Sequence, residues 1–281
     1  MATPTSRRIT IQTDGTPDFP RSYSAYLAEP PARFAGAPRG AIIVIHEIWG
    51  LVEHITDIAD RYAADRYAAE GYLVLAPDIL SAIGIEAQVG AELFAIRNSP
   101  DEEVRTAGQP RLREAFSSLS APGYAAWAVS ALRKAVDFLE QQPGVDGRIA
   151  VTGFCFGGTY SFALVAADPR VRAAVPFYGT APAPAEIARI TAPIRAFYGE
   201  HDAALIDRLP EVRREMAEAG VDFEATVYAD AGHAFFNDTN PSTYRPADAA
   251  DAWARANAFI TAVFTGPIFT GPVFTGPGGP Q

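Results

Sequence analysis

Apolar and polar residues are patterned in two different ways along the chain, and each pattern predicts a different kind of strand. Near the N-terminus, RRITIQT (7–13) and SYSAYLAEP (22–30) alternate apolar and polar residues, as half-exposed strands do. The turn residues between them predict an antiparallel pair. In contrast, GAIIVIHEIWG (40–50) and YLVLAPDIL (72–80) contain continuous apolar runs, which are typical of strands covered on both faces of a parallel sheet.

Later segments repeat the sequence of strand followed by helix. Apolar residues recur every three or four positions at 124–142, which predicts an amphipathic helix. A helix is also expected at 52–70, where DRYAA occurs twice in succession and lengthens it. Strands that alternate with helices predict an α/β fold, with a mostly parallel sheet and helices on both faces. The other expected strands are 147–155, 171–179, 193–202 and 222–230, and the other expected helices lie around 101–118, 159–168, 185–189, 205–219 and 246–264.

The body of the chain reads as one domain with an appended tail. No linker rich in glycine or serine divides residues 1–264, so we expect a single domain there. The end of the chain, VFTGPIFTGPVFTGPGGPQ, contains FTGP three times. Proline and glycine at this density prevent a regular helix. We therefore expect residues 265–281 to be an extended or disordered tail outside the active domain.

The composition of the chain limits which classes of partner and which cellular location are expected. The chain has 23 Lys and Arg against 33 Asp and Glu, a formal net charge of −10, and no basic run. This balance argues against nucleic acid or an anionic membrane as a partner. The N-terminus lacks the apolar run of a signal peptide, and no segment reaches the roughly 18 apolar residues of a membrane span. We expect a cytoplasmic protein, a monomer or small homo-oligomer, without a cofactor.

The only cysteine of the chain stands in the most informative motif. GFCFGG (153–158) has the outline of a nucleophile elbow, a sharp turn between a strand and a helix. A nucleophile at this turn needs a base and an acid that orients the base, in the chain order nucleophile, acid, histidine. Asp202 and His233 follow Cys155 in that order, each at the end of an expected strand. Each residue alone has an ordinary structural explanation, but the three together favour a catalytic triad.

Other histidines are weaker candidates for the base. His201 is adjacent to Asp202, and neighbouring residues of an extended segment point in opposite directions, so the two side chains are not expected to meet. His46 and His54 lie outside the required chain order, although His46 could line the pocket. The sequence contains neither HExxH nor CxxC, so no metal site is predicted.

A second motif, HEIWG (46–50), follows the first buried strand. Hydrolases with a nucleophile elbow place part of the oxyanion hole there, the group of donors that stabilises the negatively charged oxygen. The backbone N–H groups of Ile48 and Phe156 are the expected donors. Glu47 is unexpected here, because a carboxylate near a thiol disfavours the thiolate. It is either a surface residue or a gate that keeps the thiol unreactive until substrate arrives.

Taken in order, HEIWGLVEHITDIADR, APDIL, GFCFGG, YGEHD and AGHAFFND resemble the dienelactone hydrolase (carboxymethylenebutenolidase-like) family. The resemblance covers about residues 8–264. It implies the α/β-hydrolase fold and a triad of Cys155, His233 and Asp202. It also implies that Glu47 holds the resting cysteine neutral and, on substrate binding, turns to help ionise it.

Two departures from the family pattern affect the expected substrate. Enzymes of this family that cleave dienelactone hold its free carboxylate with arginines after the APD turn and after the catalytic histidine. LSAIG (80–84) and HAFFND (233–238) contain no arginine, although Arg97, Arg105, Arg111 or Arg113 could substitute. Trp49, Phe235 and neighbouring Phe236 suggest a more apolar pocket.

The sequence therefore predicts a hydrolase of a small ester or lactone that forms an acyl-cysteine intermediate. Three other functions stay open at this point. One is a general carboxylesterase or thioesterase. Another is a non-catalytic ligand-binding protein on a hydrolase fold, since fold does not fix function. A redox role for Cys155 ranks lowest, because the chain offers no second cysteine.

Overall fold

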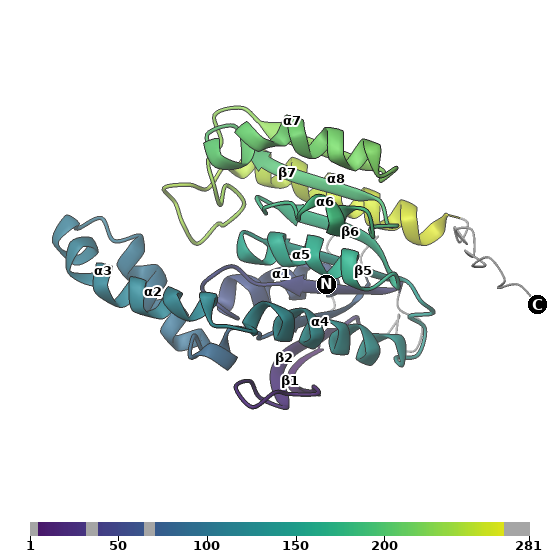
Figure 1. Cartoon of the computed structure of the whole chain (residues 1–281), viewed down its shortest axis with the longest axis horizontal. Helices are drawn as coiled ribbons and strands as arrows, with labels where there is room; N and C mark the ends of the chain where they lie inside the picture. The colour runs from purple at the N-terminus through teal and green to yellow at the C-terminus, as the bar shows by residue number, and fades with distance from the viewer. Residues whose placement is uncertain (1–4, 32–38, 65–70, 267–281) are drawn as a thin grey trace, which may run out of the picture.

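A single mixed sheet lies at the centre of the protein (Figure 1). The computed structural model describes residues 5–31, 39–64 and 71–266. The strand order is β1-β2-β4-β3-β5-β6-β7-β8. β2 pairs antiparallel with β1, as the sequence predicts, and also with β4, and the remaining pairs are parallel. The strands are β1 (Thr5–Gln12), β2 (Ser22–Glu29), β3 (Ala41–Ile45), β4 (Leu73–Pro77), β5 (Ile149–Phe154), β6 (Val171–Phe177), β7 (Ile194–Gly199) and β8 (Phe223–Tyr228).

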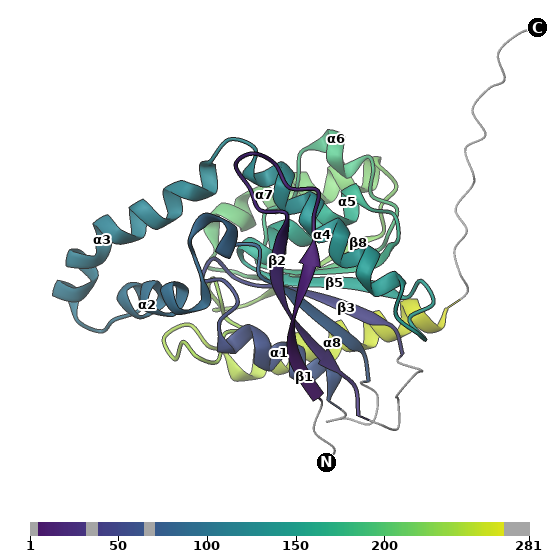
Figure 2. The same ribbon diagram turned by 90° about the horizontal axis from the view of Figure 1, so that it is seen from below.

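Helices cover both faces of the sheet (Figure 2). α1 and α8 pack on one face, where Ile42 and Val44 of β3 point, whereas α4, α5 and α7 pack on the face that receives Ile43 and Ile45. Because β3 is buried on both faces, its run of apolar residues is continuous. The helices are α1 (Glu53–Ala63), α4 (Tyr124–Glu140), α5 (Phe156–Ala167), α6 (Pro184–Ile187), α7 (Ala203–Glu218) and α8 (Pro246–Thr265).

A helical hairpin projects from this body (Figures 1 and 2). It consists of α2 (Ala87–Arg97) and α3 (Glu102–Ser117). The sequence predicts only the second of these helices. α2 has no apolar stripe at helical spacing, and only Gly90 and Leu93 are buried along it. Without that stripe, hydrophobic periodicity gives no signal for the helix.

The predicted helix at 52–70 and the predicted tail at 265–281 lie only partly within the described residues. α1 ends at Ala63, and Ala64 is already extended with ψ of 143°, whereas the rest of the predicted span, 65–70, lies outside the described residues. The second DRYAA copy, at 65–69, lies outside the described residues, as does the chain from residue 267 onward. In the described ranges, none of the helices is both long and apolar enough for a membrane span.

Candidate active site

Cys155 stands on a strained turn between β5 and α5. Its φ of 56° is rare for a residue with a side chain, and Phe156 begins the helix immediately afterwards. The flanking glycines allow this turn. A Cβ on Gly153 would lie 2.2 Å from the Gly157 carbonyl oxygen, and one on Gly157 would lie 2.1 Å from that of Ile45. The backbone therefore crosses too closely for side chains, which is the geometry that a nucleophile elbow requires.

Asp202 and His233 meet at the same edge of the sheet. Asp202 lies between β7 and α7, and His233 follows β8. Nδ1 of His233 hydrogen-bonds Oδ2 of Asp202, and Cys155 lies close enough to the ring to affect its pKa. Burial lowers the pKa of His233, but the hydrogen bonds and negative charges of Asp202 and Cys155 outweigh it and raise the pKa to about 10. This arrangement makes His233 a strong acceptor for a proton from the thiol.

The neighbouring histidine has a different environment. His201 is exposed, and its Nε2 lies 4.0 Å from an oxygen of Asp230. Its backbone N–H donates to the carbonyl oxygen of Ala231, which fixes the segment beside Asp202. The carboxylate of Asp202 thus faces His233, and His201 points away from this pair toward solvent.

Glu47 is buried rather than at the surface, with 2% of its area exposed. Its Oε1 accepts a hydrogen bond from the Tyr178 hydroxyl at 3.2 Å, and its Oε2 accepts one from Nδ2 of Asn237 at 2.8 Å. The ring of Tyr178 in turn lies 5.0 Å from that of His233. Glu47 is therefore linked to the catalytic histidine candidate through one aromatic side chain.

His46 does not line a pocket, since it is completely buried. The N–H of Ile79 donates to its Nε2 at 3.3 Å, so Nδ1 carries the proton and donates to the Glu47 carbonyl oxygen at 2.8 Å. Burial lowers the pKa of His46 to about 4. The ring is thus neutral and joins the ends of β3 and β4. Within the described ranges, no three His, Cys, Asp or Glu side chains gather as metal ligands do.

The loop after β3 brings the other predicted residues to the site edge. The N–H of Gly50 donates to the carbonyl oxygen of Glu47, which closes a turn with Ile48 and Trp49 at its centre. Phe156 is the first residue of α5, where helix geometry leaves N–H groups without an intrahelical partner. The Trp49 ring packs edge-on against Phe94 of α2 and Phe116 of α3. Trp49 thus connects this loop to the projecting hairpin.

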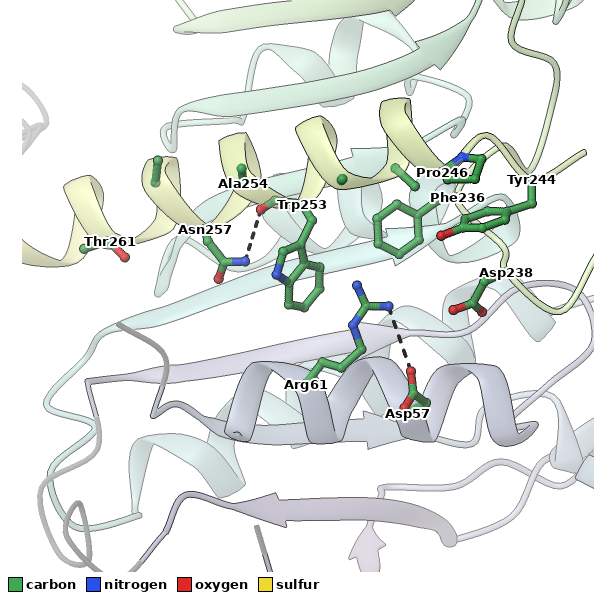
Figure 3. Close-up of a pocket in the computed structure, with 13 residues that line it drawn as sticks. Asp57, Arg61, Phe236, Asp238, Tyr244, Pro246, Trp253, Ala254, Asn257 and Thr261 are labelled. Carbon is green, nitrogen blue, oxygen red and sulfur yellow. Dashed lines mark hydrogen bonds and ion pairs between the residues drawn. The ribbon is translucent and has the colours of Figure 1, made fainter. Parts of the chain in front are cut away.

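Phe235, which the sequence suggests as a pocket residue, is buried in the core. It has no exposed area, because its ring packs against Tyr178 and Tyr228 in the core. Phe236 points instead toward a groove of about 750 Å³ between α1 and α8, which Arg61 and Trp253 also line (Figure 3). None of the triad candidates lines this groove. The two phenylalanines anchor the loop that carries His233.

Two of the four arginines considered as carboxylate ligands are already engaged within the hairpin. Nη1 of Arg105 donates to the carbonyl oxygens of Ser99 and Pro100, and Arg111 pairs with Glu92. Neither contact involves the loop after β3 or the loop after β8. Phe156, next to Cys155, and Trp49, in the loop after β3, are apolar and partly buried.

Sequence reasoning missed Tyr178 and Asn237. Both are buried, and both reach Glu47 across more than a hundred residues of chain. One signal in the sequence points to Tyr178. It directly follows a buried parallel strand, and functional groups in an α/β sheet gather at the carboxyl ends of such strands. Asn237 lies within the motif AGHAFFND, but its partner is visible only in three dimensions.

Within the described residues, a mixed sheet of eight strands with a sharp strand-to-helix turn after β5, an aspartate after β7 and a histidine after β8 has the layout of an α/β-hydrolase. The model of the "Dienelactone hydrolase family" matches residues 23–264, and the chain belongs to this family. It is accordingly a hydrolase that acts on carboxylic esters or lactones.

Individual relatives agree with this assignment. A protein of Saccharolobus solfataricus, provisionally named a carboxymethylenebutenolidase, is 31% identical over 85% of this chain and 93% of its own length. A protein of Escherichia coli K12 with the same provisional name is 32% identical over 82% of this chain and 79% of its own length. The crystal structure of a provisionally named dienelactone hydrolase from Klebsiella pneumoniae superposes with a TM-score of 0.71, is 26% identical, and covers 91% of this chain and 98% of that one.

Proposed function

We propose that this protein hydrolyses small carboxylic esters and lactones by acyl transfer to Cys155. The observation that carries the proposal is the connected set of Cys155, His233 and Asp202 at the carboxyl edge of the sheet. The raised pKa of His233 supports its role as the base, because the imidazolium that forms is stabilised by Asp202.

The reaction proceeds in two stages. His233 takes the thiol proton, and Sγ of Cys155 attacks the carbonyl carbon to form a C–S bond. The backbone N–H groups of Ile48 and Phe156 stabilise the oxyanion, and the C–O bond then breaks as His233 returns the proton to the leaving oxygen. In the second stage His233 takes a proton from water, the resulting hydroxide attacks the acyl carbon, and the C–S bond breaks to release the acid and restore the thiol.

We further propose that the favoured substrates are uncharged. Arg105 and Arg111 are held within the hairpin, and the loops around the elbow present Trp49 and Phe156. An apolar wall disfavours burial of a free carboxylate. Dienelactone carries such a carboxylate, so we expect simple esters and neutral lactones to react with higher kcat/KM.

The proposal is tested by comparing wild type, Cys155→Ala and His233→Ala on p-nitrophenyl acetate and on dienelactone. Loss of a triad member commonly costs on the order of 10⁴-fold or more in kcat, and we expect such a loss for both variants. His201→Ala is the matched control, since this exposed ring contacts Asp230 instead of the triad, and its kcat should stay within about twofold of wild type.

Mass spectrometry of the quenched wild-type reaction should show one acyl adduct, located on Cys155. Wild-type turnover by Cys155→Ala would exclude the mechanism. A ligand that binds without turnover by any variant would favour a non-catalytic role. Preference for dienelactone over the simple ester would contradict only the proposed selectivity for neutral substrates.

A further inference from the structure

The groove between α1 and α8 lies apart from the candidate triad and has the size of a small-molecule site. Its volume is about 750 Å³, within the range of roughly 300–1,000 Å³ that ligand pockets occupy. The rings of Phe236, Tyr244 and Trp253 line it, and α1 contributes Asp57 and Arg61 (Figure 3). The proposed reaction uses none of these side chains, so the groove is available to a second ligand.

The aromatic lining of the groove already holds one cation. The guanidinium carbon of Arg61 lies 4.4 Å from the centroid of the Trp253 ring and 5.6 Å from that of Phe236. At distances within about 6 Å, the face of an aromatic ring attracts positive charge. Arg61 is 22% exposed, and its Nη1 lies 3.9 Å from Oδ2 of Asp57. The rings thus favour positive charge, and the guanidinium that they hold is mostly covered.

Two carboxylates give one end of the groove a negative charge. The side chains of Asp57 and Asp238 are 48% and 42% exposed, about twice the fraction of Arg61. Oδ1 of Asp238 lies 3.3 Å from Nδ1 of His54, and this contact lowers the pKa of Asp238 below its usual value against the effect of burial. Asp238 is therefore ionised at neutral pH. Figure 3 shows both carboxylates at the end of the groove where Tyr244 lies.

The wall formed by α8 leaves room for an apolar ring or chain. Ala250, Ala254 and Ala258 line the groove and are exposed. Because they are four residues apart, they lie on one face of the helix. Their methyl groups offer apolar surface with little bulk. A ligand that fits the groove has an apolar part along α8 and a charged group at the end with the carboxylates.

We propose that the groove between α1 and α8 binds an organic cation, an ammonium ion that carries an aromatic ring or a short alkyl chain. The ammonium group lies between Asp57 and Asp238, and the apolar part lies along the alanines of α8. Two exposed carboxylates face one covered guanidinium, so the groove complements a single positive charge. The net charge of −10 adds attraction for such an ion. This inference goes beyond the proposed function and does not depend on the role of Cys155.

The test follows the indole N–H signals of the three tryptophans by NMR while a probe is added. The probe is 2-phenylethylammonium, and 2-phenylethanol is the neutral molecule of the same shape. Trp253 lines the groove, Trp49 lies in the loop after β3, and Trp127 is buried on α4. Trp49→Phe and Trp253→Phe assign the signals. We expect the Trp253 signal alone to shift, with a Kd at least about fivefold lower for the ammonium ion than for the alcohol.

Variants separate the charge of the groove from its space. Asp57→Asn removes an exposed carboxylate and should raise the Kd of the ammonium ion about threefold. Glu53→Gln makes the same charge change at an exposed position of α1 outside the groove, and should leave the Kd almost unchanged. Ala254→Leu fills the groove and should weaken binding of both probes at least about tenfold. Ala247→Leu is its control, since this exposed alanine of α8 does not line the groove.

The Cys155→Ala variant should bind the ammonium ion as wild type does, because the triad candidates do not line the groove. Its binding and its turnover therefore report separately on this inference and on the proposed function. A shift of the Trp49 signal in place of the Trp253 signal would locate the probe at the hydrolase site and overturn the proposal. An unshifted Trp253 signal, or equal Kd values for the two probes, would do the same. Binding only by a chain that ends after Gly266 would assign the groove to the residues that follow α8, and would also overturn the proposal.

Discussion

Single residues with constrained surroundings determine the site. Cys155 adopts a rare backbone conformation, which is maintained because the glycines on both sides let the chain cross itself closely. Asp168, at the far end of α5, has an equally constrained environment. It is 1% exposed, and its two oxygens accept hydrogen bonds from Nε and Nη2 of Arg170 at 2.9 and 2.6 Å.

This contact predicts how stability depends on pH. Burial raises the pKa of Asp168, but the hydrogen bonds from Arg170 outweigh it and lower the pKa below its usual value. A lowered folded pKa means that the contribution to stability is complete above the ordinary value of about 4 and is lost as the pH falls through the folded one. Asp168→Asn should reduce the free energy of unfolding at pH 7 by about 2 kcal/mol, less than for a fully buried pair because Arg170 is partly exposed.

Urea unfolding at pH 7 and at pH 3 measures the effect, and the gap between variant and wild type should narrow at pH 3. Asp146→Asn is the control, because its contact with Arg148 is at the surface and its cost should stay below about 0.5 kcal/mol. A gap that is as large at pH 3 as at pH 7 would mean that the carboxylate charge is not responsible.

At the scale of elements, the α2–α3 hairpin and the loop after β3 form one unit. α2 approaches the loop so closely that a Cβ on Gly90 would lie 1.7 Å from the backbone oxygen of Trp49. The Trp49 ring then packs between Phe94 and Phe116, one from each helix of the hairpin. The hairpin thus determines where the loop with Glu47 and Ile48 lies.

Gly90→Ala should therefore reduce catalysis more than stability. The added methyl group must push α2 away from Trp49, and a displacement of about 1 Å near reacting groups can cost on the order of 100-fold in rate. We expect kcat/KM on p-nitrophenyl acetate to fall at least about tenfold. Gly108→Ala is the matched control within the hairpin, since its methyl group would meet the side chain of Ile96 rather than a backbone. If both variants lose activity equally, the hairpin acts only through its own folding.

At the scale of the whole molecule, one edge of the sheet and one of its faces have separate tasks. The edge where the parallel strands end carries the candidate triad, and α1 and α8 close the face opposite α4, α5 and α7 (Figure 2). α8 is the last of the described elements, and its Phe264 is buried, with its ring centroid 5.9 Å from that of Tyr72. A Cβ on Gly40 would lie 2.6 Å from the Phe264 ring. Phe264 thus seals the end of this layer.

Removing the residues that follow α8 should have little effect on stability, whereas losing the ring of Phe264 should have a large one. A chain that ends after Gly266 should keep the thermal midpoint and the kcat of wild type, because the packed helix is complete. Phe264→Ala should lower the free energy of unfolding by about 3 kcal/mol, the usual cost of deleting a buried aromatic ring. Differential scanning calorimetry measures the thermal midpoint and the stability of both variants, and an assay on p-nitrophenyl acetate measures kcat. A lower midpoint for the shortened chain would show that the FTGP repeats contribute to folding.

The sequence predicts what depends on local pattern and fails where contacts are long-range. The buried strands and the motif around Cys155 were recognisable because each is continuous in the chain. α2 was missed because it packs through Gly90 and has no apolar stripe. The sequence suggests Phe235 for the pocket although its ring packs in the core, and it gives no sign of the contact between Asn237 and Glu47, because the direction of a loop side chain depends on partners far away in sequence.

The first strand has a consequence for how the molecule behaves among its own copies. Among the residues that the structure describes, β1 pairs with β2 alone, so its other edge presents backbone groups without a strand partner there. An open edge of this kind can recruit a strand from another chain and begin aggregation. Arg7 and Arg8 stand on this edge and are exposed. Arg7 forms an ion pair with Glu29 of β2, and charged side chains on an edge strand disfavour its pairing with a second copy of the chain.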